Sequence, residues 1–389
     1  MLITISRTAA ALATGLALAL AAPLLPTAAA APATSAADQD PAPVLRLPSP
    51  TGPFAVGRDT LHLVDRDRTD PWVPEAGARE LLVSMYYPAR SGTGRTAPYL
   101  TADEARLLLE SQHLEGVIAP EDVAATGITA RVGARPERGR HPLVVLSPGF
   151  SLPRTTLTLL AEELASRGYV VAAVDHAYES VGTLFPGDRM LTCVACEAAD
   201  DLSVVAEGRA ADLSFVLDRL TGPRPAWRYA GLIDTTRIGM AGHSIGGNAT
   251  AVTMARDPRV RAGVNMDGTF FAPVPAEGLD GRPFMMLGTE SLHHPGGEDE
   301  SWDEGWARLD GWRRWLTVTG SGHFTFIDLP VLGGQLGMTD PEAPLSGERS
   351  GEITRDYVAA FFDAHLRGLP APLLDGPTAA NPEVVFQGR

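Results

Sequence analysis

A short run of glycines around a serine constrains this chain more than any other feature. Gly242 to Gly246 reads GHSIG, and it lies between an apolar stretch, 237–241, and a helix-like stretch, 245–256. Where a strand turns sharply into a helix, glycines are needed beside the serine because side chains there would collide with the neighbouring backbone. Such a turn lifts the serine hydroxyl above the sheet. The pattern therefore predicts a nucleophilic Ser244 at a strand-turn-helix elbow.

Around this elbow, short apolar runs alternate with helix-like segments. Val, Ile and Leu dominate the runs, which is typical of parallel strands buried on both faces. The other segments carry apolar residues on one face at helical spacing. The pattern predicts the α/β-hydrolase fold, a mostly parallel central sheet with helices on both faces. We expect strands at 81–87, 142–147, 169–174, 237–241, 260–266, 283–288 and 315–319, and helices at 154–167, 202–220, 245–256, about 303–314 and 351–366.

A serine hydroxyl needs a general base, and the base needs a carboxylate that holds it in one tautomer. In this fold both groups follow the serine along the chain. His323 follows the strand expected at 315–319 and is the candidate base. His243 is expected to point away from the serine, and His293 and His294 lie in a polar loop rich in Pro and Gly. The position after a late strand therefore favours His323.

Two carboxylates compete for the role of the acid. Asp267 ends the strand expected at 260–266, and Glu290 ends the next strand, 283–288. Because both lie at the carboxyl ends of strands, their positions alone leave both candidates open.

The two ends of the chain differ in composition from its middle. Residues 1–31 contain Arg7, then an apolar run and small residues, which is typical of a secretory signal peptide. Residues 32–55 are rich in Pro and Ala and are expected to form a flexible leader. We therefore expect a secreted, extracellular protein with one catalytic domain at 56–375 and a C-terminal tail at 376–389.

Charge and composition exclude several classes of function. The formal net charge is −15, all 32 basic residues are arginines, and no dense basic run is present. Nucleic-acid binding depends on basic contacts to phosphates, so nucleic acid is excluded as an expected partner. The absence of lysine excludes Schiff-base chemistry and the lysine-dependent phosphate loop. We expect the protein to need no cofactor and no metal.

Cys193 and Cys196 are the only cysteines in the chain. A C-x-x-C pair in a cytosolic protein would suggest a redox centre, but this pair follows an export signal and does not lie at a strand-to-helix turn. Zinc needs about four ligands, and no second pair lies nearby. A local disulfide, within a loop insertion expected at 183–201, is favoured over free thiols and over a metal site.

Five segments form a specific combination: Pro142–Phe150 (PLVVLSPGF), Ala165–His176 (ASRGYVVAAVDH), Gly242–Gly247 (GHSIGG), Asn265–Gly268 (NMDG) and Gly322–His323. Together they resemble plasma-type platelet-activating-factor acetylhydrolases and their bacterial lipase-like relatives, over most of residues 80–366. In that family the acid follows the strand after the elbow helix, so the resemblance selects Asp267. It also implies that the backbone N–H groups of Phe150 and Ile245 hold the oxyanion.

The resemblance implies a serine carboxylic-ester hydrolase that acts on lipid-like or short-acyl esters. Phospholipids with a short or oxidised acyl chain are the favoured substrates, which implies transient contact with a lipid interface. Aromatic and aliphatic side chains near the expected site are candidates for the substrate pocket, namely Phe150, Leu152, His176, Tyr178, Phe270, Phe271, Trp302 and Phe324.

Three other interpretations stay open. Bacterial cutinases and polyester hydrolases share a similar SPGF run, but they look to have Asp two residues beyond the place of Glu290, where this chain has Leu292. An acyltransferase would pass the acyl group to an alcohol instead of water. A secreted binding protein on a degenerate hydrolase scaffold is disfavoured, because Ser244, His323 and Asp267 form a complete set.

Overall fold

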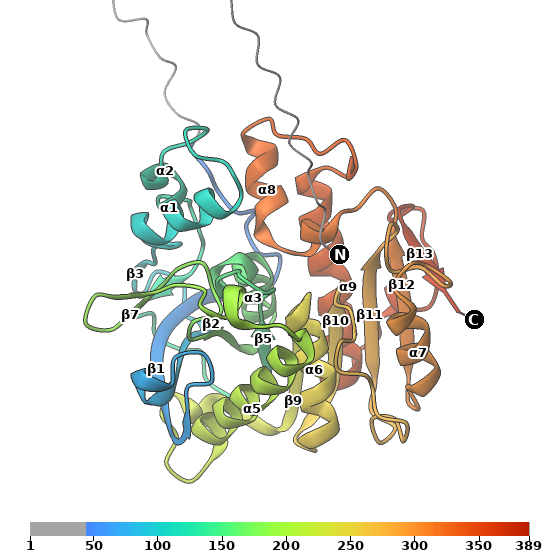
Figure 1. Cartoon of the computed structure of the whole chain (residues 1–389), viewed down its shortest axis with the longest axis horizontal. Helices are drawn as coiled ribbons and strands as arrows, with labels where there is room; N and C mark the ends of the chain where they lie inside the picture. Colours follow the sequence, from blue (N-terminus) through green and yellow to red (C-terminus); the bar gives the residue numbers. More distant parts are fainter. Residues whose placement is uncertain (1–43, 389) are drawn as a thin grey trace, which may run out of the picture. The chain divides into compact units, whose positions relative to one another are not determined.

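The structure is a computed structural model that describes residues 44–388. The signal peptide expected at 1–31 and the first part of the expected leader, 32–43, lie outside these residues. Eleven strands form one sheet in the order β13-β12-β11-β10-β9-β5-β6-β2-β1-β4-β3 (Figure 1). Their bounds are β1 (Ala55–Thr69), β2 (Ala78–Ala89), β3 (Arg95–Thr96), β4 (Arg131–Val132), β5 (His141–Ser147), β6 (Val170–His176), β9 (Ile233–His243), β10 (Val260–Met266), β11 (Phe284–Thr289), β12 (Arg313–Val318) and β13 (Val384–Gln387).

The strands from β6 through β5, β9, β10 and β11 to β12 run parallel, and β2, β1 and β13 add antiparallel neighbours at the two sides. Two further strands pair in a separate hairpin, β7 (Thr183–Phe185) and β8 (Arg189–Leu191). The helices are α1 (Ala102–Ser111), α2 (Pro120–Ala124), α3 (Thr158–Ser166), α4 (Ala195–Ala198), α5 (Leu202–Thr221), α6 (Ile245–Arg256), α7 (Glu300–Arg308), α8 (Asp328–Gln335) and α9 (Gly347–Arg367).

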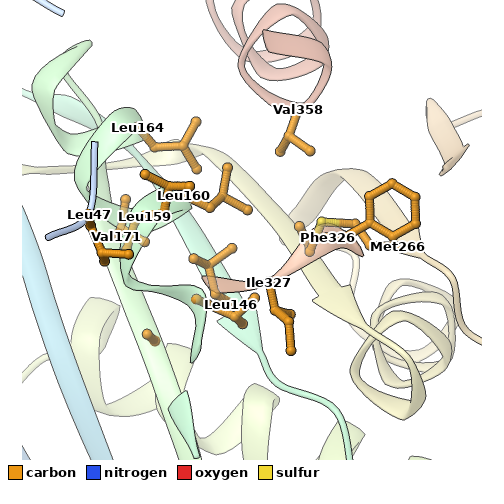
Figure 2. Close-up of a cluster of buried hydrophobic side chains, with 14 of the residues drawn as sticks. Leu47, Leu146, Leu159, Leu160, Leu164, Val171, Met266, Phe326, Ile327 and Val358 are labelled. Atoms are coloured by element: carbon orange, nitrogen blue, oxygen red, sulfur yellow. The ribbon is translucent and has the colours of Figure 1, made fainter. Parts of the chain in front are cut away.

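The sheet is buried on both faces because its strands alternate apolar side chains between two cores. In β5, Val144 and Leu146 join the core beneath α3 and α9, whereas Leu143 and Val145 join the core beneath α5, α6 and α7. Figure 2 shows part of the first core, where Leu146 packs among leucines of α3. Each such fully buried side chain contributes about 1.5 to 3 kcal/mol relative to exposure. The expected α/β-hydrolase fold is confirmed.

All the expected strands are present, but three helix predictions are wrong at their ends. The helix expected at 351–366 is α9, which begins at Gly347. The helix expected at 154–167 begins with a 3₁₀ turn, Arg154–Leu157, before α3. The helix expected at about 303–314 is α7, which ends at Arg308 before β12 begins. Gly311 allows the turn between them, because a Cβ there would lie 2.4 Å from the carbonyl oxygen of Gly281.

The chain beyond the expected domain limits is also packed on the sheet. Leu45 and Leu47 of the expected leader are buried, and Leu47 N–H donates to the Gly127 carbonyl (2.9 Å). In the expected tail, β13 pairs with β12 from Val384 onward. An unpaired edge strand exposes backbone hydrogen-bonding groups, and β13 provides partners for that side of β12. Within residues 44–388, no helix is both long enough and apolar enough to cross a bilayer.

Cys193 precedes α4 and Cys196 lies within it, with their sulfur atoms 2.06 Å apart. We predict that the freshly produced mature protein carries this pair as a disulfide, because the signal peptide expected at 1–31 would direct it to an oxidising compartment. Intact-mass measurement before and after treatment with an alkylating reagent checks this. Both cysteines should stay unmodified until a reductant is added, and alkylation of both without reductant would contradict the disulfide.

Candidate active site

The predicted elbow lies where β9 ends and α6 begins. Ser244 caps α6 with a positive φ of 55°, and its backbone N–H donates to the Met266 carbonyl (2.8 Å). A non-glycine residue in this region of φ is strained, and such strain is often found at functional sites. Gly246 is required because a Cβ there would lie 2.1 Å from the Ser147 carbonyl oxygen. Close approach of β5 and α6 thus leaves no room for a side chain at Gly246, and Ser244 near it is half-buried.

Three side chains expected to work together are connected by hydrogen bonds. Ser244 Oγ lies 3.0 Å from His323 Nε2, and His323 Nδ1 lies 2.7 Å from Asp267 Oδ2. His323 stands on a 3₁₀ turn after β12, and Asp267 directly follows β10. The carboxyl ends of parallel strands meet at one edge of the sheet, which explains how residues so distant in sequence come together.

Asp267 is fully buried and accepts hydrogen bonds on both oxygens. Oδ2 accepts from His323, while Oδ1 accepts from the Thr289 backbone N–H (2.8 Å) and from His293 Nδ1 (2.5 Å). Burial opposes ionisation, but the hydrogen bonds from His293 and His323 and their electrostatic attraction outweigh it and hold the pKa of Asp267 well below its usual range. The carboxylate is therefore ionised beside His323.

His293 is a hydrogen-bond partner of Asp267 that the sequence did not predict. It was placed in a polar loop, yet its ring is buried and lies between Asp267 and Asp299, with Nε2 2.9 Å from Asp299 Oδ2. The competing acid, Glu290, is exposed, and its carboxylate accepts only a long contact from the Gly320 N–H (3.4 Å). The structure thus brings Asp267, and not Glu290, against His323.

His243 was expected to point away from the serine, and its position beside the candidate base was not predicted. Its ring is buried against that of His323, with ring centroids 4.7 Å apart. Nε2–H donates to the His323 backbone carbonyl (2.7 Å), so His243 holds the main chain of the candidate base in place. Burial and the nearby His323 lower the pKa of His243 to about 3, which keeps this imidazole neutral.

The predicted oxyanion donors lie on either side of the elbow. Phe150 follows Gly149 in the loop after β5, and Ile245 is the first residue of α6. Within residues 44–388 neither N–H donates to another backbone or side-chain group. Both are therefore free to bind a negative oxygen near Ser244.

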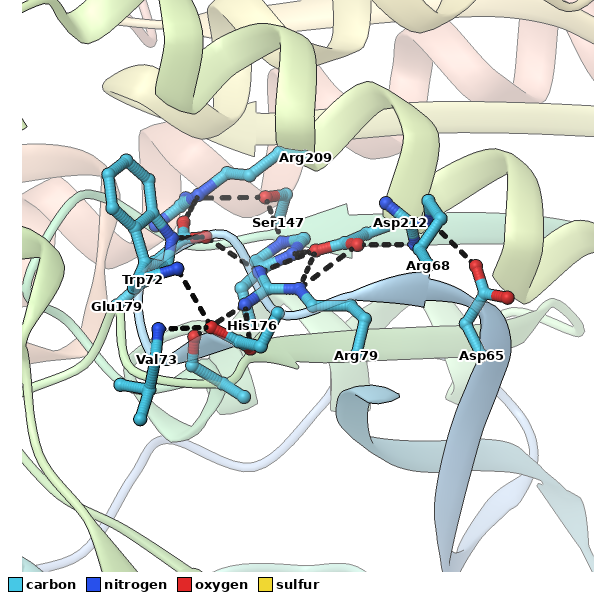
Figure 3. A network of polar contacts seen from close by, with 12 residues as sticks. Asp65, Arg68, Trp72, Val73, Arg79, Ser147, His176, Glu179, Arg209 and Asp212 are labelled. Carbon is cyan, nitrogen blue, oxygen red and sulfur yellow. Dashed lines mark hydrogen bonds and ion pairs between the residues drawn. The ribbon is translucent and has the colours of Figure 1, made fainter. Parts of the chain in front are cut away.

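Below this loop lies a buried network of charged residues (Figure 3). Arg209 donates to the Pro148 carbonyl (2.5 Å), directly before Gly149 in the oxyanion loop. His176 Nδ1–H donates to Asp212 (2.7 Å), and its Nε2 accepts from the Ser147 hydroxyl (3.1 Å). Hydrogen bonds to this network therefore hold the start of the loop at the Ser147 hydroxyl and at the Pro148 carbonyl.

Arginines and carboxylates pair with one another inside the network. Arg79 is buried and bonds to Asp70 (2.9 Å), Glu179 (2.6 Å) and Asp212 (2.8 Å), and Glu179 also accepts from Arg209 (2.7 Å). Burial opposes ionisation of Asp212, but Arg79 and His176 hold its pKa well below the usual value. Removing one partner from such a cluster costs about 3 to 5 kcal/mol, because the others stay buried without their counter-charge.

A large apolar cavity of about 530 Å³ opens beside the candidate base. Its walls come from α1, α2, α8, the chain from α8 into α9, and the loop that carries His323 and Phe324. Leu108, Val123 and Leu332 are among the side chains that line it. Apolar walls with a polar group at one end are typical of ligand sites.

The chain matches, over residues 42–188 and 227–340, the family described as platelet-activating factor acetylhydrolase, isoform II. The match covers more than half of the sequence and includes Ser244, Asp267 and His323. The chain belongs to the platelet-activating factor acetylhydrolase isoform II family. The resemblance seen in the sequence is thereby confirmed, and this acetylhydrolase-family protein is an ester hydrolase.

Named relatives of this acetylhydrolase-family protein differ in their esters. A probable 1-alkyl-2-acetylglycerophosphocholine esterase of Arthroderma benhamiae is 28% identical over 375 residues, 87% of this chain and 93% of the relative. The solved structure of a ferulic acid esterase from Streptomyces cinnamoneus is 45% identical, with a TM-score of 0.80, and covers 89% of this chain and 100% of that one. A bis(hydroxyethyl) terephthalate hydrolase of Streptomyces coelicolor is 27% identical over 180 residues, 44% of this chain and 50% of the relative.

Of the eight side chains predicted to line the substrate pocket of this acetylhydrolase-family protein, one lines the cavity beside His323. Phe324 lines the cavity, but Phe270 and Trp302 belong to the core beneath α7, and His176 belongs to the charged network. Aromatic type alone does not separate a core side chain from a pocket side chain. The four remaining candidates do not line this cavity either. Phe271 is exposed and Leu152 is buried. Phe150 and Tyr178 pack against other hydrophobic clusters.

Proposed function

We propose that this protein is a secreted serine carboxylic-ester hydrolase in which Ser244 is the nucleophile, His323 the general base and Asp267 the acid. The observation that carries the proposal is the hydrogen-bond chain from Ser244 Oγ through His323 to Asp267, at 3.0 and 2.7 Å. The expected signal peptide at 1–31 supports secretion.

In the first half of the reaction, Ser244 Oγ attacks the ester carbonyl carbon and its proton passes to His323 Nε2. The new imidazolium is stabilised by the ionised Asp267 carboxylate. The N–H groups of Phe150 and Ile245 bind the negative oxygen. When the intermediate collapses, the carbon–oxygen bond to the alcohol breaks, and His323 returns its proton to the leaving alcohol.

Water completes the cycle by the same route. His323 takes a proton from a water molecule as the water oxygen attacks the acyl-enzyme carbonyl. The bond from the acyl carbon to Ser244 Oγ then breaks, His323 returns the proton to Ser244, and the carboxylic acid leaves.

The apolar cavity supports lipid-like esters as the substrates. An alkyl or acyl chain would gain about 0.8 kcal/mol for each methylene buried against walls such as Leu108 and Leu332. Phe324 and Met338 line the cavity and are 39% and 37% exposed, which suits an opening that meets a lipid surface. Family membership favours phospholipids with a short or oxidised acyl chain within this class.

A second candidate is an ester of an aromatic acid. The observation that favours it is the 45% identity to the ferulic acid esterase from Streptomyces cinnamoneus, which is higher than the 28% identity to the glycerophosphocholine esterase from Arthroderma benhamiae.

One experiment tests the function and separates the candidates. The purified mature protein is assayed on an alkyl-acetyl phospholipid, p-nitrophenyl esters from acetate to dodecanoate, methyl ferulate and polyester film, with Ser244→Ala as the matched control. The favoured proposal expects the highest kcat/KM on the phospholipid. A preference for methyl ferulate or for film would move the assignment to the aryl or polyester class, and no turnover on any ester would contradict the proposal.

The cavity makes a prediction of its own. Leu336 lines it after α8, and Leu336→Trp should remove room for about two methylenes, or ~1.6 kcal/mol. We expect kcat/KM on p-nitrophenyl dodecanoate to fall about tenfold, with little change on the acetate ester. Leu369→Trp, at an exposed position after α9, is the control. Equal losses on both esters would show that the cavity does not hold the chain.

A further inference from the structure

We propose that His293 is a second histidine of the catalytic machinery, a positively charged positioning residue that shares the Asp267 carboxylate with His323. Its role is to keep His323 neutral, and so able to accept a proton, at a lower pH than Asp267 alone would allow. The inference rests on the proposed function, because it assigns a purpose to the surroundings of the same acid.

The hydrogen bonds of the His293 ring indicate its charge. Nδ1 lies 2.5 Å from Asp267 Oδ1, and Nε2 lies 2.9 Å from Asp299 Oδ2. A neutral imidazole has only one N–H, whereas an imidazolium has two. Because each ring nitrogen faces a carboxylate oxygen, the ring satisfies both contacts as an imidazolium. Asp299 is also bonded to Thr269 Oγ1 (2.6 Å), which fixes its position as the outer acceptor.

The rest of the surroundings holds the ring in place. His293 is 1% exposed and stacks on Trp302, with centroids 4.1 Å apart and planes at 14°. Such stacking favours a cation over an indole ring. Its backbone carbonyl accepts from Trp315 Nε1 (3.0 Å) and Thr317 Oγ1 (2.9 Å), so its main chain is fixed to β12.

The titratable groups around His293 agree with this assignment. Asp267 faces the His293 ring from the end of β10, and Asp299 faces it from the start of α7. His323 binds the other oxygen of Asp267, and the neutral His243 packs against His323. Burial disfavours the charged ring, but hydrogen bonds to Asp267 and Asp299 outweigh burial and raise the pKa of His293 to about 9. The ring therefore keeps both protons near neutral pH.

The consequence concerns the proton affinity of His323. A carboxylate beside an imidazole stabilises its protonated form, and a positive charge nearby opposes that form. His293 binds one oxygen of Asp267 while His323 binds the other, so the imidazolium offsets part of the carboxylate charge that His323 experiences. Asp299 lies on the far side of the His293 ring, so the positive charge is the nearer one.

The test compares pH profiles of kcat/KM for His293→Asn and His293→Gln with the wild type on one soluble ester. Both variants are neutral, so the acidic limb should move up by about one pH unit in each. Asn can place its amide N–H near the position of Nδ1 and should retain more of the wild-type kcat than Gln. His294→Gln, at the half-buried neighbouring position, is the matched control and should leave the limb unchanged.

A measurement on the unmodified protein covers the case in which neither variant folds. Among the nine histidines, ¹⁵N NMR of the imidazoles should show one ring that still carries two protons at about pH 8. An unshifted acidic limb in folded variants, or no doubly protonated ring at that pH, would overturn the inference. Retention of turnover by Ser244→Ala would instead overturn the proposed function, so the two failures are distinguishable.

Discussion

Ser244→Ala is expected to lower kcat by about 10⁶ while the fold remains intact. In the proposed mechanism Ser244 supplies the oxygen that forms the acyl-enzyme, and alanine has no atom that can form that bond. Alanine fits the elbow because it is smaller than serine. The positions where a side chain would collide with neighbouring backbone, Gly242 and Gly246, are unchanged in this variant. Turnover of a p-nitrophenyl ester, with circular dichroism as the check on folding, measures the effect.

The same assay carries its own cross-check. An organophosphate should label the wild-type protein once, at Ser244, and should leave Ser244→Ala unlabelled. Turnover of the variant within about tenfold of the wild type would contradict the assignment of the nucleophile.

Asp267→Asn is expected to lower kcat by about 10⁴. The structure gives a specific reason. The Thr289 backbone N–H donates to Oδ1, so the asparagine must place its own oxygen there and turn its NH₂ group toward His323. His323 Nδ1 then has to accept a hydrogen bond, which places the ring proton on Nε2, facing Ser244. In that tautomer His323 cannot take the serine proton.

Glu290→Gln is the matched control for Asp267→Asn. Glu290 also follows a strand of the same sheet, but it is exposed and bonds only weakly to Gly320. We expect kcat of this variant to stay within about twofold of the wild type. A large loss for Glu290→Gln beside a small loss for Asp267→Asn, with both proteins folded, would reverse the assignment of the acid.

The parts of the fold and the site that the sequence predicts are those with local signals. The elbow at Ser244 was predicted because the glycines around it serve a turn whose neighbours leave no room for side chains. Buried parallel strands such as β5 and β10 were found because they are almost wholly apolar. By contrast, β1 mixes charged and apolar residues, because it lies toward the side of the sheet and is only partly buried. Its alternation is too irregular to mark a strand.

What escaped prediction depends on contacts between distant segments. Asp267 and Glu290 both end strands, and the choice between them needed a family resemblance because their side chains lie in different surroundings that spacing does not encode. His293 gives no local sign of its role, since its partners Asp267 and Asp299 lie on other elements. The role of His243 was not predicted because its partner is a backbone carbonyl, which no residue type reveals.

The cavity walls and the proposed catalytic groups come from different parts of the chain. This separation affects how the substrate preference of such a protein can evolve. Ser244, Asp267 and the oxyanion loop stand at strand ends, whereas the walls come mainly from α1, α2 and α8, with His323 at the border. A mutation in a wall can therefore alter which ester fits without moving the hydrogen bonds that perform the chemistry. Substitutions in the walls would then shift the preferred ester one residue at a time while the proposed catalytic hydrogen bonds persist.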